Sequence, residues 1–303
     1  MTTFKVQGGL KLKGDLHPQG AKNEALQVLC AILLTPEEVI MENVPDIRDV
    51  NILIELLRDL NVGVTKIDES TYHFKANKIN IDYLSSDAYK AKSSRIRGSI
   101  MIVGPLLARY GKGYIPRPGG DKIGRRRLDT HFIGFENLGA KFVYDSKEEF
   151  YRVTADKLTG AYMLLAEASV TGTANIIMTA VMAKGKTTIY NAACEPYLQQ
   201  LCKMLNSMGA KITGVGSNLI NIEGVEYLGG CTHRILPDMI EIGSFIGLAA
   251  ITKSEITIKN VAYDELGVIP SVFTKLGVKM ERKGDDIFIP AQENYEIQSF
   301  IDG

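Results

Sequence analysis

The sequence lacks a net charge. Its 303 residues carry 35 lysines and arginines against 35 aspartates and glutamates. Proteins that bind nucleic acid or anionic membranes by bulk attraction carry an excess of positive charge, so both classes are disfavoured. Any affinity for anions must come from local clusters of cations.

The sequence also lacks a long apolar run. No stretch approaches the ~18 consecutive apolar residues that a membrane helix needs, and the start has no apolar core of a signal peptide. We therefore expect a cytoplasmic protein without membrane insertion.

Cysteine is scarce. The four cysteines form no C-x-x-C pair and have no spacing with the four histidines that is typical of a metal site. We expect free thiols, no metal and no cofactor. Cys30 lies on the apolar face of a predicted helix, which favours a role in core packing.

One short segment concentrates opposite charges. Residues 118–131 read Pro-Gly-Gly-Asp-Lys-Ile-Gly-Arg-Arg-Arg-Leu-Asp-Thr-His, which sets Asp121 beside four cations. Proline and glycine at its start disfavour the interior of a helix or strand, so an exposed loop is predicted. Charge alone leaves open whether this loop is merely solvated or binds an anion.

A local pattern recurs about every 70 residues. An apolar helical segment leads to leucine or methionine, then glycine or asparagine, then a short strand, at residues 60–64, 138–142, 208–212 and 276–280. Glycine or asparagine at this place is typical of a helix C-cap with positive φ. The pattern predicts repeated βαβαββ units, and the length suggests about two domains.

Each repeat also contains a helix that is apolar on all sides, at residues 24–34, 100–108, 173–183 and 241–250. Such helices are typical of a protein interior. We therefore predict an α/β (α+β) fold whose units pack around shared buried helices.

Polar residues open three of these helices. Lys22 precedes the first, where a cation is unfavourable unless an anion binds there. Arg97 precedes the second, and its planar guanidinium can hold two phosphate oxygens. Ser169 precedes the third. A solvent-facing lysine, a flanking arginine and an ordinary N-cap are the alternatives for these three residues.

The loop at 118–131 and the segment Gly-Ala-Lys-Asn at 20–23 resemble motifs of the UDP-N-acetylglucosamine 1-carboxyvinyltransferases. This resemblance implies transfer of the enolpyruvyl group of phosphoenolpyruvate to the 3'-hydroxyl of UDP-N-acetylglucosamine. Phosphate is released, in the first committed step of peptidoglycan synthesis. These two small molecules are the expected partners, with no nucleic acid.

The resemblance also implies a domain organisation, a two-domain inside-out barrel. Residues 21–233 would form a complete domain of three βαβαββ units that carries the loop. Residues 1–20 and 234–303 would form one unit of three in an incomplete second domain. The family's general base would lie beyond Gly303, so the chain alone is expected to be inactive.

The resemblance further implies roles for single residues. Asp121 stands where most of the family has cysteine, would protonate phosphoenolpyruvate, and implies insensitivity to fosfomycin. Residues 169–173 resemble the family turn Ser-Val-Gly-Ala-Thr, which holds the diphosphate, whereas Glu167 cannot ligate phosphate. The implied substrate-binding residues are Lys22, Asn23, Arg97, Arg126, Arg127, Leu128, Asp129, Thr130, His131, Ser169 and Val170.

Two alternatives remain for the function. One is a non-catalytic protein that binds a nucleotide sugar. The other is another enolpyruvyl transferase such as 5-enolpyruvylshikimate-3-phosphate synthase, which lacks this loop. A dinucleotide-binding enzyme is disfavoured, because the glycines at 119, 120 and 124 do not have the G-x-G-x-x-G spacing.

Overall fold

The computed structural model describes residues 3–116, 127–146 and 150–298. It divides into two compact units: a smaller one of Met1–Ala21 with Leu236–Gly303, and a larger one of Lys22–Ile235. The boundaries expected from the sequence, 21 and 233, lie close to these. That the larger unit is a complete domain of the family remains a prediction.

The larger unit repeats the order helix, strand, helix, strand, strand. The first repeat is α1 (Lys22–Ala31) with η1 (Ile32–Leu34), β2 (Glu38–Glu42), α2 (Arg48–Asp59), β3 (Gly63–Lys66) and β4 (Tyr72–Lys75). The second is η3 (Arg97–Ile102) with α4 (Val103–Tyr110), β5 (Lys112–Pro116), α5 (Asp129–Asn137), β6 (Lys141–Asp145) and β7 (Phe150–Thr154). The third is α6 (Val170–Ala180), β9 (Lys186–Tyr190), α7 (Pro196–Ser207), β10 (Lys211–Thr213) and β11 (Leu219–Glu223). Four further elements connect or close the repeats: η2 (Ile81–Ser85), α3 (Asp87–Ser93), β8 (Tyr162–Leu164) and β12 (Cys231–Arg234).

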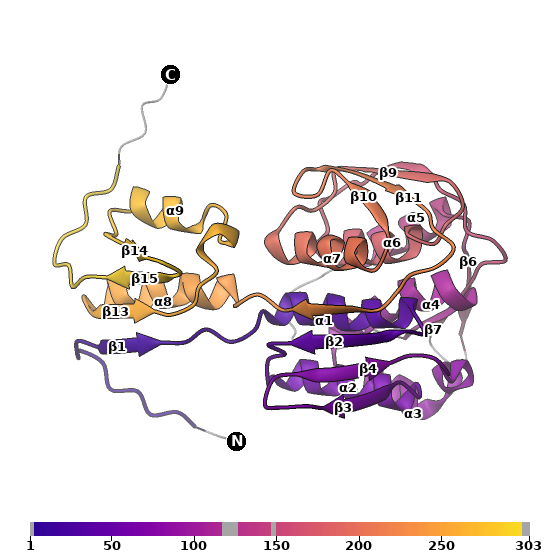
Figure 1. Cartoon of the computed structure of the whole chain (residues 1–303), viewed down its shortest axis with the longest axis horizontal. Coiled ribbons are helices and arrows are strands. Elements are labelled where there is room, and N and C mark those ends of the chain that lie inside the picture. Colours follow the sequence, from indigo (N-terminus) through magenta and orange to yellow (C-terminus); the bar gives the residue numbers. More distant parts are fainter. Residues whose placement is uncertain (1–2, 117–126, 147–149, 299–303) are drawn as a thin grey trace. The chain divides into compact units, whose positions relative to one another are not determined.

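Each repeat of the larger unit builds one sheet with the same strand arrangement. The orders are β12-β2-β4-β3, β5-β7-β6 and β8-β9-β11-β10. Within a repeat the strands pair antiparallel, whereas β12 and β8 join from outside the repeat and pair parallel to β2 and β9. Figure 1 shows β9, β10 and β11 on one side of α6 and α7. The predicted α/β fold of repeated units is confirmed.

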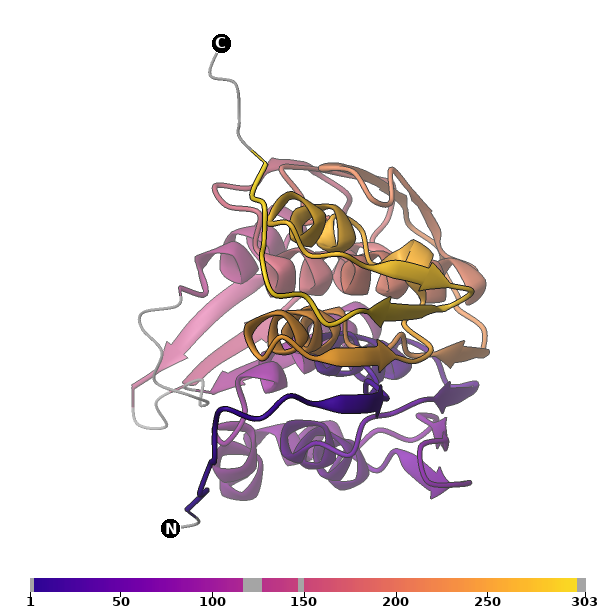
Figure 2. The same ribbon diagram turned by 90° about the vertical axis from the view of Figure 1, so that its left-hand side faces the viewer.

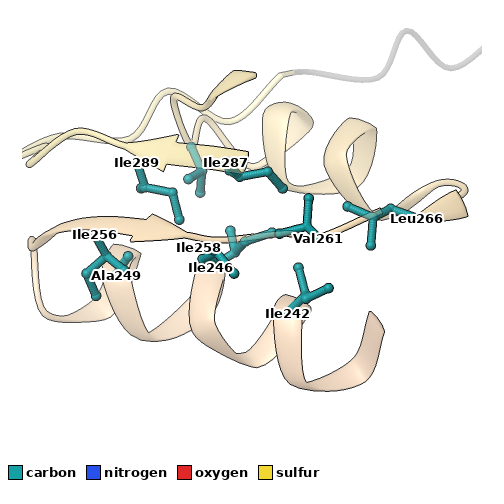
Figure 3. Packing of buried hydrophobic residues seen from close by; sticks show 10 residues of the cluster. Ile242, Ile246, Ala249, Ile256, Ile258, Val261, Leu266, Ile287 and Ile289 are labelled. Atoms are coloured by element: carbon teal, nitrogen blue, oxygen red, sulfur yellow. The ribbon is translucent and has the colours of Figure 1, made fainter. Parts of the chain in front are cut away.

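The smaller unit holds a fourth copy of this arrangement. It comprises β1 (Lys13–Leu16), α8 (Met239–Ile251), β13 (Glu255–Ile258), η4 (Tyr263–Glu265), α9 (Ile269–Lys275), β14 (Glu281–Lys283) and β15 (Asp286–Ile289). The order is β1-β13-β15-β14, with β1 parallel to β13 (Figures 1 and 2). Isoleucines of α8, β13 and β15 form its core (Figure 3).

The residues that end the helices have the predicted conformation. Asn61, Gly139, Gly209 and Gly277 have φ values of 67°, 98°, 105° and 82°. The left-handed region turns the chain sharply after a helix, and only glycine and asparagine adopt it at low cost. This local chemistry explains why the pattern could be found in the sequence.

Burial of the apolar helices follows the prediction in one case and departs from it in another. Every residue of α6 from Gly172 to Ala180 is buried, as predicted. In α8 only Ile242, Ile246 and Ala249 are buried, whereas Ile251 is 85% exposed. The prediction of a fully buried helix was wrong for α8, because the described strands of the smaller unit cover only one of its faces (Figure 3).

The four cysteines are free thiols, as expected, and Cys30 is buried in the core. Burial raises the pKa of the Cys30 thiol, which keeps it protonated. None of the described helices is both long enough and apolar enough to span a membrane.

Candidate active site

Four helices of the larger unit begin at one pocket. It has a volume of about 780 Å³, and its lining includes the first residue of α1, α2, η3 and α6. These residues are Lys22, Arg48, Arg97 and Val170. Helix N-termini present unpaired backbone N–H groups and partial positive charge, so the pocket suits an anion.

Side-chain charge adds to this effect. The described lining carries five cations and two carboxylates. The cations are Lys22, Arg48, Arg95, Arg97 and Arg127, and the carboxylates are Asp49 and Glu167. The chain as a whole has no net charge, but this pocket has an excess of positive charge. Such an excess favours binding of a ligand that carries phosphate.

Lys22 is held at the pocket by an ion pair. Its Nζ lies 2.7 Å from Oδ2 of Asp49, and the two side chains are 39% and 36% exposed. Asp49 lies in the first turn of α2, where a carboxylate is favoured by the helix dipole. The pair thus joins the starts of α1 and α2, and a bound anion would compete with Asp49 for the ammonium group.

Arg97 connects the pocket to the segment that follows the loop. One of its Nη atoms donates to the backbone oxygen of Arg127 at 3.4 Å. The Arg127 guanidinium pairs with the Asp129 carboxylate at the start of α5. Arg97 and Arg127 both line the pocket, so two arginines of the second repeat lie there, one from the start of η3 and one from the segment before α5.

His131 lies behind the pocket wall rather than in it. Its imidazole is 2% exposed, with Nδ1 lying 3.1 Å from Nδ2 of Asn175 and Nε2 lying 3.3 Å from Oγ1 of Thr171. Burial, together with the charge of Arg97, lowers the pKa of His131 to about 4. The imidazole is therefore neutral at pH 7.

The start of α6 is capped in the ordinary way and also faces the pocket. The Ser169 hydroxyl accepts from the backbone N–H of Gly172 at 3.3 Å, which is an N-cap contact. Ser169, Val170 and Thr171 all line the pocket. The cap and a ligand-binding role are therefore compatible. Glu167 accepts from the Thr130 hydroxyl at 3.3 Å.

The structure brings six of the predicted site residues to the pocket: Lys22, Asn23, Arg97, Arg127, Ser169 and Val170. Four others lie beside it at the start of α5: Leu128 as the N-cap, Asp129, and the buried Thr130 and His131. Asp121 and Arg126 lie outside the described residues. The roles of all twelve remain predictions.

Sequence reasoning missed several residues of this site. Arg48 opens α2 just as Lys22 opens α1, so a cation in the first turn of a helix was a signal available for both. Thr171 was read only as part of a turn. Asn175 is a buried amide on an apolar helix, and no sequence pattern indicates that it contacts His131.

Among the residues that the structure describes, no three His, Cys, Asp or Glu side chains lie together as a potential metal site. The described lining of the pocket supplies cations, helix N-termini and hydroxyl groups.

Comparison with known proteins agrees with this geometry. Residues 6–300 match the family model described as EPSP synthase (3-phosphoshikimate 1-carboxyvinyltransferase). A UDP-N-acetylglucosamine 1-carboxyvinyltransferase of Bacteroides thetaiotaomicron is 64% identical over 303 residues, which is 100% of this chain and 70% of that protein. One of Porphyromonas gingivalis is 58% identical over the same shares.

Solved structures show the same fold. The enolpyruvyl transferase NikO from Streptomyces tendae matches with a TM-score of 0.81 at 18% identity, over 94% of this chain and 67% of that one. An EPSP synthase from Acinetobacter baumannii matches with a TM-score of 0.69 at 16% identity, over 94% and 66%. On the family match and the close relatives together, this chain belongs to the enolpyruvyl transferase family.

Proposed function

We propose that this chain belongs to a UDP-N-acetylglucosamine 1-carboxyvinyltransferase, an enzyme that transfers the enolpyruvyl group of phosphoenolpyruvate to the 3'-hydroxyl of the nucleotide sugar and releases phosphate. The observation that carries the proposal is the convergence of four helix starts and five cations on one pocket. Both substrates are anions, and a relative of that name is 64% identical to this chain.

The pocket residues divide into groups with different tasks. Lys22 and Arg97 would hold the phosphate of phosphoenolpyruvate, because an ammonium group and a guanidinium compensate its charge and donate hydrogen bonds. The start of α6, with Ser169 and Val170, would hold the diphosphate of the nucleotide sugar. Asn23 follows Lys22 on α1 and lines the same pocket.

The transfer itself needs a proton and a stabilised phosphate. As the sugar oxygen attacks C2 of phosphoenolpyruvate, the 3'-hydroxyl loses its proton to a base, and the methylene carbon gains a proton, for which we propose Asp121. The C–O bond to phosphate then breaks while the new methyl group loses a proton, which restores the C=C bond of the enolpyruvyl group. Cations that bind the departing phosphate more strongly than the substrate lower the barrier. Lys22 and Arg126 are the proposed cations.

Calorimetry with matched ligands tests the substrate. UDP-N-acetylglucosamine should bind, whereas shikimate 3-phosphate should not. Lys22→Ala should weaken binding of phosphoenolpyruvate, while Lys66→Ala, on a strand away from the pocket, should not. Binding of shikimate 3-phosphate in preference to the nucleotide sugar would favour the other transferase.

A phosphate-release assay separates transfer from binding alone. Release that requires both substrates would establish the reaction. Binding of UDP-N-acetylglucosamine without any phosphate release, in an enzyme of the full length of the relatives, would support the non-catalytic alternative. We also propose a cytoplasmic location, because phosphoenolpyruvate is an intermediate of cytoplasmic metabolism.

A further inference from the structure

The orientation of the Asn175 side chain is fixed by two backbone groups. The N–H of Gly104 donates to Oδ1 at 2.9 Å, and Nδ2 donates to the backbone oxygen of Ile100 at 2.9 Å. A backbone N–H can only donate and a carbonyl can only accept, so the amide cannot be turned over without losing both bonds. Asn175 is fully buried, where such a loss is costly.

This orientation sets the tautomer of His131. The second hydrogen of Asn175 Nδ2 is directed to His131 Nδ1, 3.1 Å away. Nδ2 can only donate, so Nδ1 must be the unprotonated, accepting nitrogen. The proton of the neutral imidazole then lies on Nε2. The lowered pKa of His131 agrees with a ring that carries one proton.

The tautomer in turn directs the hydroxyl group of Thr171. His131 Nε2 lies 3.3 Å from Thr171 Oγ1 and has to donate, so the threonine oxygen accepts. The hydroxyl hydrogen must then find another acceptor, and no described residue supplies one. Thr171 is exposed at the second residue of α6 and lines the pocket. An acceptor on a bound ligand would complete the chain of hydrogen bonds.

We propose that Thr171 is a substrate-binding residue that donates its hydroxyl hydrogen to a phosphate oxygen of the nucleotide sugar. Asn175 and His131 are the positioning residues that aim this hydrogen. The proposal rests on the function proposed above and adds a contact to it, because the family turn that residues 169–173 resemble has glycine at this place.

Matched variants at Thr171 test the contact in the full 303-residue chain. A hydrogen bond to a charged group contributes enough that Thr171→Val, which keeps the shape, should weaken UDP-N-acetylglucosamine binding about 10- to 100-fold in calorimetry. Thr171→Ser, which keeps the hydroxyl group, should bind within about threefold of the wild type.

The outcomes separate this proposal from the function on which it rests. If the wild type binds UDP-N-acetylglucosamine and Thr171→Val binds it equally well, Thr171 makes no such contact and this proposal is wrong. If the wild type does not bind the nucleotide sugar, the proposed function fails, and this proposal with it. Thermal unfolding of both variants checks that they are folded.

The positioning role has its own measurement. Nitrogen-15 NMR of labelled histidine at pH 7 should show His131 as neutral with the proton on Nε2. A proton on Nδ1, or on both nitrogens, would contradict the proposed chain of hydrogen bonds even if Thr171→Val weakened binding.

Discussion

At the scale of single residues, burial gives His131 a measurable effect on stability. The pKa of His131 in the folded chain is about 4, below the ordinary value of 6.5. Between these two pH values the unfolded chain binds a proton at this histidine and the folded chain does not. The contribution is fully present above pH 6.5 and is lost as the pH falls toward 4. The loss should reach about 3 kcal/mol, since one pKa unit corresponds to about 1.4 kcal/mol.

Denaturant unfolding at pH 7 and pH 4.5 checks this expectation. The stability of His131→Gln should fall less between the two pH values than that of the wild type. His73→Gln is the matched control, because His73 is only partly buried and lies on strand β4, whereas His131 lies on helix α5. Equal pH dependence of the His131 variant and the wild type would show that His131 is not the group responsible.

The Lys22–Asp49 ion pair predicts an effect on anion affinity. Asp49→Asn should tighten phosphoenolpyruvate binding up to about fivefold. The Lys22 ammonium group would no longer have to leave the Asp49 carboxylate to bind the ligand, and the pocket would lose a negative charge. Asp46→Asn is the control, since Asp46 is exposed, bonds to Asn51 and does not line the pocket. Weaker binding by Asp49→Asn in titration calorimetry would mean that Asp49 positions Lys22 instead.

Asp121 carries the prediction that most directly concerns catalysis. An unperturbed aspartate has a pKa near ~3.9, so it can donate a proton at neutral pH only where burial or nearby anions raise that pKa. In an enzyme of the full length of the relatives, Asp121→Asn should abolish phosphate release with UDP-N-acetylglucosamine binding retained. Asp121→Cys should make any measured turnover sensitive to fosfomycin, which alkylates a thiolate. Turnover by the asparagine variant at the rate of the wild type would remove Asp121 from the mechanism.

At the scale of elements, α4 and α6 approach closely at Gly104. A Cβ added there would lie 2.3 Å from Oδ1 and 2.6 Å from the backbone oxygen of Asn175. Gly104→Ala should therefore destabilise the protein by about 1–3 kcal/mol, as overpacked cores do. Gly247→Ala in α8 meets no atom within 4 Å and should be neutral or stabilise by up to about 1 kcal/mol. Thermal unfolding of the Gly104→Ala and Gly247→Ala variants measures whether stability depends on the close approach of α4 and α6.

Elements also show where sequence reasoning succeeds and where it stops. The repeats and their caps were predictable because positive φ at Gly139 or Gly209 is a local demand on one residue type. The partial exposure of α8 could not be predicted, because the apolar composition of a helix does not indicate which other elements pack against it. The addition of β12 to the sheet of the first repeat depends on pairing between distant segments, because β12 pairs with β2.

The same limit holds for the site. Lys22 and Arg97 could be predicted from the sequence, because a cation at the start of a helix is unfavourable unless an anion binds there. The link from Asn175 through His131 to Thr171 joins α6 to α5, and nothing in the spacing of these residues indicates that their side chains meet.

At the scale of the whole molecule, the larger unit contains the complete lining of the pocket as described. We expect a fragment of residues 22–235 to fold by itself and to bind UDP-N-acetylglucosamine within about threefold of the full chain. Circular dichroism and calorimetry check both properties. A fragment of residues 22–230 is the control, because it lacks β12. An unfolded 22–235 fragment would show that the smaller unit is needed for folding.

The position of β12 has a consequence for synthesis on the ribosome. This strand pairs with β2, 192 residues earlier, and His233 Nε2 lies 2.8 Å from the buried Glu24 carboxylate on α1. Helix α1, the first to be synthesised, therefore cannot make its contact with β12 until residue 234 has been added. At about 5–20 residues per second, that delay lasts on the order of ten to forty seconds. During this time the edge of β2 and the acidic side chain of Glu24 lack their final partners, so the nascent chain presents an open strand edge of the kind that chaperones shield.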